Sequence, residues 1–391
     1  MLSLPHLPKL TIGDMDVPLP IIQGGMGVGV SLSSLASAVA DEGGVGVISA
    51  AILKGADLDG EPRDSLLSRL EFLRREIARS RRRTKGAIGV NILVALTDYD
   101  DYFQLSVERG VECIFLGAGL PLKLPPIVAD AGAAKLHTKL IPIVSSGRAA
   151  EVILRSWEKR YGRSPDAFVV EGPLAGGHLG FSRKQLDDPA FALEHLVGDV
   201  LEVVAQHSER LGRRIPVIAA GGVYTGGDVE HFLELGAAGV QMATRFVTTH
   251  ECDAAAEFKQ AYLNAKQEDI VIIDSPLGLP GRAVNNDFLR AAERGEKEPR
   301  NCPWKCMKTC DQRQAHYCIA GALERARRGN LQHGFTFAGA NAYLADEIIS
   351  VKELFGSLVF EYQVAVFRRR FAEAIERLRR RLPVFRPQSG F

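Results

Sequence analysis

One pattern repeats eight times between residues 20 and 242 and restricts the possible folds. Each unit is a short apolar run, rich in Val and Ile, that ends in Gly or a polar residue and precedes a stretch with helical spacing. Continuous apolar runs without alternation predict strands that are buried on both faces, as in parallel sheets. We expect strands at Pro20–Gln23, Val45–Ser49, Ala87–Asn91, Cys113–Leu116, Leu140–Val144, Ala167–Glu171, Pro216–Ala220 and Gly239–Met242.

Eight such units in about 250 residues indicate a (β/α)8 TIM barrel. A doubly wound open sheet is the alternative, but such sheets usually contain about five to seven strands. The intervening segments have one apolar face, as at Leu32–Ala40, where Ser31 is a candidate N-cap, and at Ser65–Arg79. The fold we expect is therefore the closed barrel.

The βα rhythm stops after residue 246, and this predicts the domain organisation. Residues 1–246 and 336–365 should form the barrel, and residues 247–335 a smaller subdomain inserted after strand eight. Within the insert we expect helices near 254–265 and 315–328 and a strand at 269–274. Residues 366–391 should form an Arg-rich helical tail with Phe367, Phe371, Ile375 and Leu378 on one face.

Composition excludes several classes of protein. The 391 residues carry a formal net charge of +1, which argues against a nucleic-acid binder of the whole-domain basic type. No apolar run approaches the roughly 18 residues of a membrane span, and residues 1–13 do not resemble a signal peptide. We expect a cytoplasmic protein that binds a small-molecule substrate.

Candidate functional groups gather where the predicted strands end, which is the active face of a TIM barrel. Consecutive backbone N–H groups at Gly-rich turns bind anions, and the loops after strands seven and eight commonly hold a phosphate. Those loops contain Gly221-Gly222 and Ala243-Thr244 here. The pattern predicts a phosphorylated ligand, which on these residues alone can be a flavin, pyridoxal, or a sugar or nucleotide substrate.

Five segments, in this order, resemble the nitronate monooxygenase family (formerly 2-nitropropane dioxygenases), which includes FMN-dependent enoyl-acyl-carrier-protein reductases. They are Pro20–Met26, Val90-Asn91, Glu171–Gly180, Ile215–Gly222 and Gly239–Phe246. The resemblance covers roughly residues 18–290 and 337–360. It implies FMN in the barrel, with its phosphate at the Gly221-Gly222 and Ala243-Thr244 loops, and an active-site imidazole at His178. The full set of expected cofactor-binding residues is Gly24, Gly25, Met26, Asn91, Glu171, Gly176, Gly177, Gly221, Gly222, Gln241, Met242, Ala243 and Thr244.

The chain departs from the family pattern at three points. Gly24-Gly25 stands where many nitronate-oxidising members have Ala-Pro, so the first strand end looks more like that of the reductases. Ala243 replaces a usual Gly beside the phosphate. A cysteine cluster and the Arg-rich tail lie outside what most members have.

The resemblance suggests two reactions. In the first, O2 oxidises alkyl nitronates through the flavin to a carbonyl compound and nitrite, with His178 as acid or base, because unperturbed imidazole titrates near neutral pH. In the second, NAD(P)H supplies electrons through FMN to an enoyl thioester or a similar activated alkene. Glu171 can orient His178 or the ribityl chain, or form an ion pair in the barrel mouth. A non-catalytic barrel that binds a phosphorylated ligand is the alternative from another class of protein.

Four of the six cysteines fall close together, at Cys302, Cys306, Cys310 and Cys318. Clustered cysteines in a reducing compartment suggest a metal site, although the paired C-x2-C of zinc sites is missing. The alternatives are an iron–sulfur cluster, which we favour over zinc, and free or redox-active thiols. An iron–sulfur cluster would favour the reductase function.

Two basic runs, near 74–85 and 368–381, are either solvated helix faces, oligomer contacts such as those of a homodimer, or surfaces for an acidic carrier, a membrane or nucleic acid.

Overall fold

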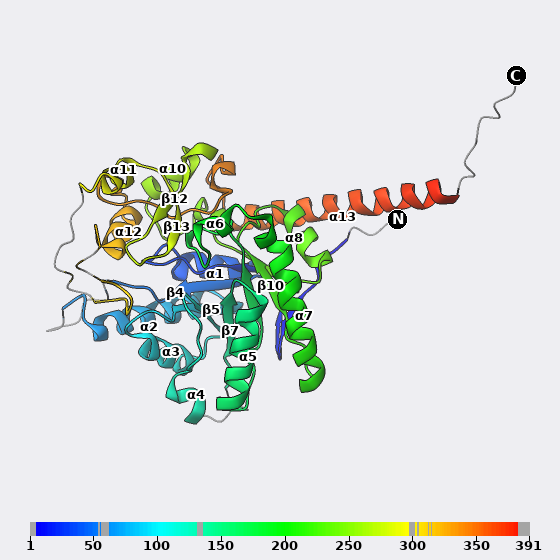
Figure 1. The fold of residues 1–391 in the computed structure, drawn as a ribbon, viewed down its shortest axis with the longest axis horizontal. Coiled ribbons are helices and arrows are strands. Elements are labelled where there is room, and N and C mark those ends of the chain that lie inside the picture. Colours follow the sequence, from blue (N-terminus) through cyan, green and yellow to red (C-terminus); the bar gives the residue numbers. More distant parts are fainter. Residues whose placement is uncertain are drawn as a thin grey trace, which may run out of the picture.

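The computed structural model describes residues 5–53, 55, 62–130, 136–296, 302, 305–311, 313 and 315–381, without the side chains of 379 and 381. Its centre is a closed barrel of eight parallel strands in the order β10-β11-β3-β4-β5-β6-β7-β8 (Figure 1). These are the eight strands expected from the sequence: β3 Ile21–Gln23, β4 Val45–Ser49, β5 Ala87–Leu93, β6 Cys113–Gly117, β7 Lys139–Val144, β8 Phe168–Glu171, β10 Val217–Ala220 and β11 Gly239–Met242. The barrel fold is therefore confirmed.

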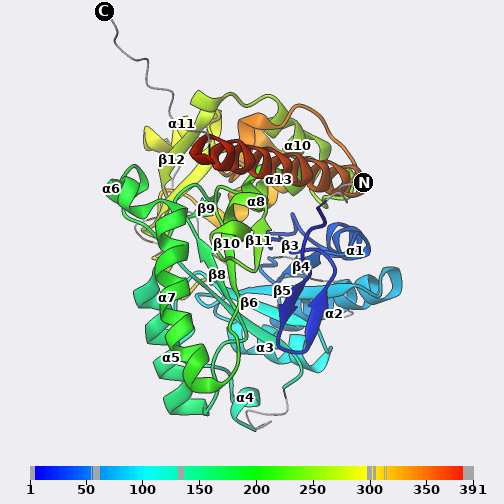
Figure 2. The same cartoon turned by 90° about the vertical axis from the view of Figure 1, so that its right-hand side faces the viewer.

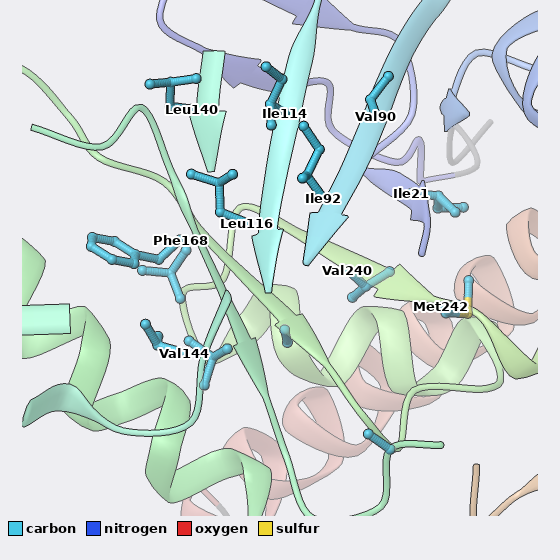
Figure 3. Packing of buried hydrophobic residues seen from close by; sticks show 14 of the residues in the cluster. Ile21, Val90, Ile92, Ile114, Leu116, Leu140, Val144, Phe168, Val240 and Met242 are labelled. Carbon is cyan, nitrogen blue, oxygen red and sulfur yellow. The ribbon is translucent and has the colours of Figure 1, made fainter. Parts of the chain in front are cut away.

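Side chains alternate between the barrel interior and the surrounding helices, as the two-residue period of a strand requires. Ile22, Val47 and Phe115 lie in an inner core. Val90 and Leu116 belong to a larger outer core between the strands and the helices (Figure 3). This alternation decides which polar residues at the strand ends can reach the barrel mouth.

The helices surround the barrel in chain order. They are α1 Ser33–Asp41, α2 Leu66–Arg83, α3 Tyr99–Glu108, α4 Pro126–Asp130, α5 Gly147–Tyr161, α6 Arg183–Leu186, α7 Leu193–Leu211, α8 Gly226–Glu234, α9 Thr244–Val247 and α13 Val351–Arg381. The first part of α13 packs against α8 and α1 and so takes the place of the eighth barrel helix. Within the described residues, no helix is both long enough and apolar enough to cross a membrane.

A short antiparallel hairpin that the sequence did not predict precedes the barrel. Its strands are β1 Leu10–Ile12 and β2 Met15–Val17. Leu10, Ile12 and Val17 are fully buried together with the inward-facing barrel residues. The hairpin thus completes the inner core of the barrel (Figure 2).

The start of α1 differs from expectation. Ser31 is not its N-cap; Leu32 holds that position and offers no side-chain cap. Instead, the carboxylate of Asp253 accepts hydrogen bonds from the backbone N–H groups of Leu32, Ser34 and Leu35 at 2.8, 3.3 and 3.2 Å. The unpaired N–H groups of the helix are satisfied from a residue far along the chain.

The segment after the barrel strands covers one end of the barrel (Figure 1). Its elements are α10 Ala256–Leu263, β12 Ile270–Asp274, β13 Pro280–Val284, α11 Asp287–Glu293 and α12 Ile319–Arg327. β12 pairs with β13, and β13 pairs with β9 Gly177–His178, which belongs to the loop after β8. The insert therefore shares a sheet with the barrel loop.

The expected domain boundaries stay predictions. Helix α13 runs without interruption through the boundary expected at 365/366. The final ten positions of the expected tail, 382–391, lie outside the described residues, as do 297–301, 303, 304, 312 and 314 of the expected insert.

Candidate active site

Three polar side chains lie at the carboxyl ends of barrel strands and face the barrel interior. Asn91 on β5, Glu171 on β8 and Gln241 on β11 each continue the inward-facing alternation of their strand. Among the described residues, none of the three has a hydrogen-bond partner for its side chain. Burial raises the pKa of Glu171 to about 7. Amide and carboxyl groups without a partner in the protein can pair with a ligand, so this layer is suited to a polar ligand.

Glycines keep the space beside this layer free of side chains. A Cβ at Gly25 would overlap the Cβ of Asn91 and lie 3.0 Å from its Cγ. A Cβ at Gly24 would lie 3.3 Å from the Cγ of Gln241, and the Gly24 N–H donates to the Met242 carbonyl at 2.7 Å. The structure therefore brings the end of β3 against the predicted residues Asn91 and Gln241.

The loops after β10 and β11, where a phosphate was expected, lie next to a segment that returns from the insert. Gly221 and Gly222 have φ angles of +80° and +131°, which only glycine adopts easily. The Asn341 side-chain amide donates to the Gly222 carbonyl at 2.8 Å, and the Gly339 N–H donates to Thr244 Oγ1 at 3.0 Å. The two loops are thus held together by residues that the sequence analysis did not select.

Two expected cofactor residues contribute differently from the rest. Met242 is 2% exposed and its side chain lies in the outer core (Figure 3), so only its backbone faces Gly24. The Met26 N–H donates to Ser31 Oγ at 2.8 Å, and its side chain packs between the barrel core and the insert. Ala243 precedes the short helix α9.

His178 lies on β9, where the insert meets the barrel loop. Its Nε2 is 2.7 Å from Ser275 Oγ, and its ring meets Phe337 edge-on with centroids 5.1 Å apart. Ser275 Oγ accepts a hydrogen bond from the Leu277 N–H at 3.2 Å, so its own proton is available for Nε2. We assign the remaining ring proton to Nδ1 on the basis of this network. Burial lowers the pKa of His178 to about 4, so the ring is neutral at physiological pH.

The loop that carries His178 is fixed against the phosphate loops by close backbone contacts. A Cβ at Gly176 would lie 2.6 Å from the Ala338 carbonyl carbon and the Gly339 nitrogen. A Cβ at Gly221 would lie 2.7 Å from the Gly172 carbonyl oxygen. Gly177 adopts φ of +81°. These contacts explain why this stretch is rich in glycine.

Sequence reasoning missed four residues of this site: Ser275, Phe337, Gly339 and Asn341. The Gly- and Phe-rich segment 334–340 was a visible signal for two of them, Phe337 and Gly339, and Asn341 follows it directly. Ser275 gave no signal, because its pairing with His178 joins positions 97 apart in the chain.

The cysteine segment docks on the loop that follows β5. The Thr97 N–H donates to the Cys306 carbonyl at 3.0 Å, and the Lys308 N–H to the Ala95 carbonyl at 2.9 Å. Burial raises the pKa of Cys306 to about 12, and the charges of Cys318, Cys302 and Cys310 contribute in the same direction. The four thiols therefore lie within electrostatic reach of one another. In the part of the chain that the structure describes, however, no three His, Cys, Asp or Glu side chains are arranged to hold a metal ion.

The fold and the mouth of the barrel define a class, the (β/α)8-barrel flavin-dependent oxidoreductases. Within that class, the chain belongs to the nitronate monooxygenase family, whose model matches residues 11–113 and 99–361. A probable nitronate monooxygenase of Staphylococcus saprophyticus is 25% identical over 356 residues, covering 86% of this chain and 92% of that protein.

Two further relatives broaden the comparison. A 5-hydroxy-7a-methyl-1-oxo-octahydro-1H-indene-4-carboxyl-CoA dehydrogenase of Mycobacterium tuberculosis is 29% identical over 278 residues, covering 71% of this chain and 66% of that protein. The structure of FabK from Thermotoga maritima superposes with a TM-score of 0.69 at 29% identity, covering 91% of this chain and 96% of that one.

Proposed function

We propose that the chain binds FMN at the barrel mouth and oxidises alkyl nitronates. The observation that carries this proposal is the glycine-lined mouth with Asn91, Glu171 and Gln241 left without partners, beside the His178–Ser275 pair. Side chains at Gly24 and Gly25 would crowd Gln241 and Asn91, which fits a flat ring laid against the strand ends. The Gly221-Gly222 and Ala243-Thr244 loops would hold the phosphate.

The flavin, when bound, supplies the exchange of electrons with the substrate. Asn91 and Gln241 carry amide groups that can donate to and accept from the edge of its ring. Glu171, with its pKa near neutrality, can accept from or donate to a hydroxyl group in the same mouth. The chain's own contribution is to orient the ring.

His178 acts in this proposal as a neutral hydrogen-bond donor. Because Ser275 donates to Nε2, the Nδ1–H is left to donate to a nitronate oxygen. A nitronate is already deprotonated, so its oxidation needs no base. An imidazole with a pKa of about 4 is a poor base at neutral pH, which favours nitronates over neutral nitroalkanes as substrates.

A second candidate is the NAD(P)H-dependent reduction of an enoyl thioester. The Gly24-Gly25 strand end favours it, as does the similarity to a relative that acts on a coenzyme A thioester. In that reaction the Nδ1–H of His178 would donate to the thioester carbonyl oxygen and polarise the double bond.

Anaerobic stopped-flow spectroscopy of the FMN-loaded protein separates the two reactions. We expect rapid loss of the flavin absorbance near 450 nm on mixing with propyl-2-nitronate, and slow loss with NADPH. Rapid bleaching by NADPH together with inertness toward nitronates would reject the first proposal in favour of the second. Protein that takes up no FMN would reject both.

His178→Ala tests the donor role. We expect FMN to remain bound and turnover of nitronates to fall by about a hundredfold. With Glu171→Gln protein, which lacks the carboxyl group whose pKa is about 7, kcat should be independent of pH above about 5 and should change only as the pH falls through about 4, where the ring gains a proton. A kcat that rises with pH around 6.5 would show instead that His178 titrates normally and acts as a base.

A further inference from the structure

The second half of α13 leaves the body of the protein. Val351, Leu354, Phe355 and Leu358 at the start of the helix are buried in the outer core. After Val366, which is 3% exposed, the helix projects beyond the barrel (Figure 1). Among the described residues, the last ion pairs to the body run from Arg369 to Glu230 and Glu234 on α8, at 2.5 and 2.6 Å.

Helix α13 carries an exposed apolar stripe that begins before Val366 and continues along the projecting part. Phe360, Phe367, Phe371 and Leu378 are 66%, 63%, 59% and 61% exposed. At 3.6 residues per turn, these four positions fall within about 20° of one line along the helix. The rings of Phe367 and Phe371 stack with centroids 6.2 Å apart. Single exposed apolar residues are ordinary, but an aligned stripe of large ones marks an interaction surface.

The charged residues are ordered around the stripe. Arg368 lies about 80° from it on one side, and Arg370 and Arg377 lie about 80–100° from it on the other. Glu373 and Glu376 lie on the opposite face, about 140–160° away. Arg369 is also on that opposite face, and its ion pairs with α8 turn the stripe away from the protein.

The distribution of charge on the helix favours one binding partner for the apolar stripe over another. Residues 366–381 contain seven arginines and two glutamates. Two copies of the helix that met through their stripes would place arginine rows against arginine rows, which disfavours self-pairing. The surface of an anionic membrane complements both the apolar stripe and the flanking arginines. The phenyl rings enter the boundary of its acyl chains, while the guanidinium groups reach its phosphates.

We propose that residues 366–381 bind the surface of a lipid bilayer that contains anionic lipid. A bilayer suits an extended lone helix, since it needs no groove of matching shape. The helix lies on the membrane and does not cross it. This inference is independent of the reaction proposed above, and its tests do not measure turnover.

Sedimentation of the full-length protein with vesicles tests the proposal. We expect binding to vesicles of phosphatidylcholine mixed with phosphatidylglycerol, weak binding to phosphatidylcholine alone, and release by salt. Phe367→Ser with Phe371→Ser should weaken binding by at least about tenfold. Arg368→Gln with Arg370→Gln and Arg377→Gln should remove the preference for anionic vesicles.

The matched control is Glu373→Gln with Glu376→Gln, on the opposite face of the same helix, which should bind vesicles at least as well as wild type. All variants should keep the wild-type melting temperature, because the changed side chains lie outside the core. Failure to sediment with anionic vesicles would overturn the proposal. If the protein is a dimer in solution and the double Phe variant is a monomer, the stripe binds a second copy of the chain and the proposal is wrong. If the helix binds only an acidic protein, the stripe binds a protein partner and the proposal is also wrong.

Discussion

At the scale of single residues, the site depends on positions that tolerate no side chain. Gly25 lies against Asn91, and Gly176 lies against the backbone of Ala338 and Gly339. The first contact keeps the mouth open beside the strand ends. The second fixes the loop that carries His178. Glycine is used at both for close approach of chain segments and not for flexibility.

Gly25→Ala should therefore destabilise the protein and weaken FMN binding. The added methyl group forces Asn91 out of place, and overpacking of this kind typically costs about 1–3 kcal/mol. The control is Gly198→Ala on α7, where a Cβ would meet nothing within 4 Å, and which should stabilise by about 0.5–1 kcal/mol. Thermal unfolding measures the change in stability, and flavin titration measures the change in FMN affinity. Equal FMN affinity in Gly25→Ala and wild type would contradict the proposal that FMN binds beside Gly25 and Asn91.

Ser275→Ala should impair the reaction while leaving the fold intact. Without the hydroxyl donor, Nε2 can carry the ring proton and Nδ1 loses its role as donor. The loss of one hydrogen bond in a buried site corresponds to about a tenfold fall in kcat. Nitrogen NMR of labelled histidine should report the change of tautomer, and Ser275→Thr should restore both kcat and tautomer. An unchanged tautomer in Ser275→Ala would remove Ser275 from the site.

At the scale of elements, the N-terminus of α1 shows where local sequence stops being informative. Ser31 has the right residue type and place for an N-cap, yet its hydroxyl instead accepts from the Met26 N–H. The cap comes from Asp253, and Glu76 on α2 accepts from the Ser33 N–H at 3.0 Å. Spacing along the chain predicts a helix and its buried face, but it does not show a partner that arrives from another element.

Asp253→Ala should lower stability by about 2–3 kcal/mol through the loss of three hydrogen bonds. Burial raises the pKa of Asp253 from 3.8 to about 6, so the native state binds more protons than the unfolded chain between these values. The contribution of Asp253 therefore decreases as the pH rises through about 6, and the loss in the variant should be larger near pH 5 than near pH 7.5. Melting temperatures at the two pH values provide the test; the opposite trend would refute it.

At the scale of the whole molecule, the barrel was predictable because its signal is repeated. Eight apolar runs fix eight buried strands, and closure places their ends in one mouth. That is also why Asn91, Glu171 and Gln241 could be grouped from sequence. The hairpin at 10–17, the two-residue strand β9 and the pairing of His178 with Ser275 depend on contacts between distant segments, which no periodicity records.

The cysteine cluster remains a prediction at this scale. Iron and zinc analysis of anaerobically purified protein tests it: iron found together with flavin, and lost in Cys306→Ser, would support the cluster against the arrangement of the described side chains, which holds no metal ion. The replacement Cys113→Ser, at a buried thiol in the barrel interior, is the control and should keep the iron. Protein without iron or zinc would show that the four residues are free thiols.

The sheet shared by β12, β13 and β9 has a consequence for the order of events in turnover. Ser275 follows β12 directly, and His178 is half of β9. Any displacement that breaks the pairing of β13 with β9 also separates the Ser275 hydroxyl from the His178 imidazole and opens the imidazole to water. If substrate enters by that displacement, entry and an aligned imidazole cannot occur at the same time, and β13 must pair with β9 again before the reaction.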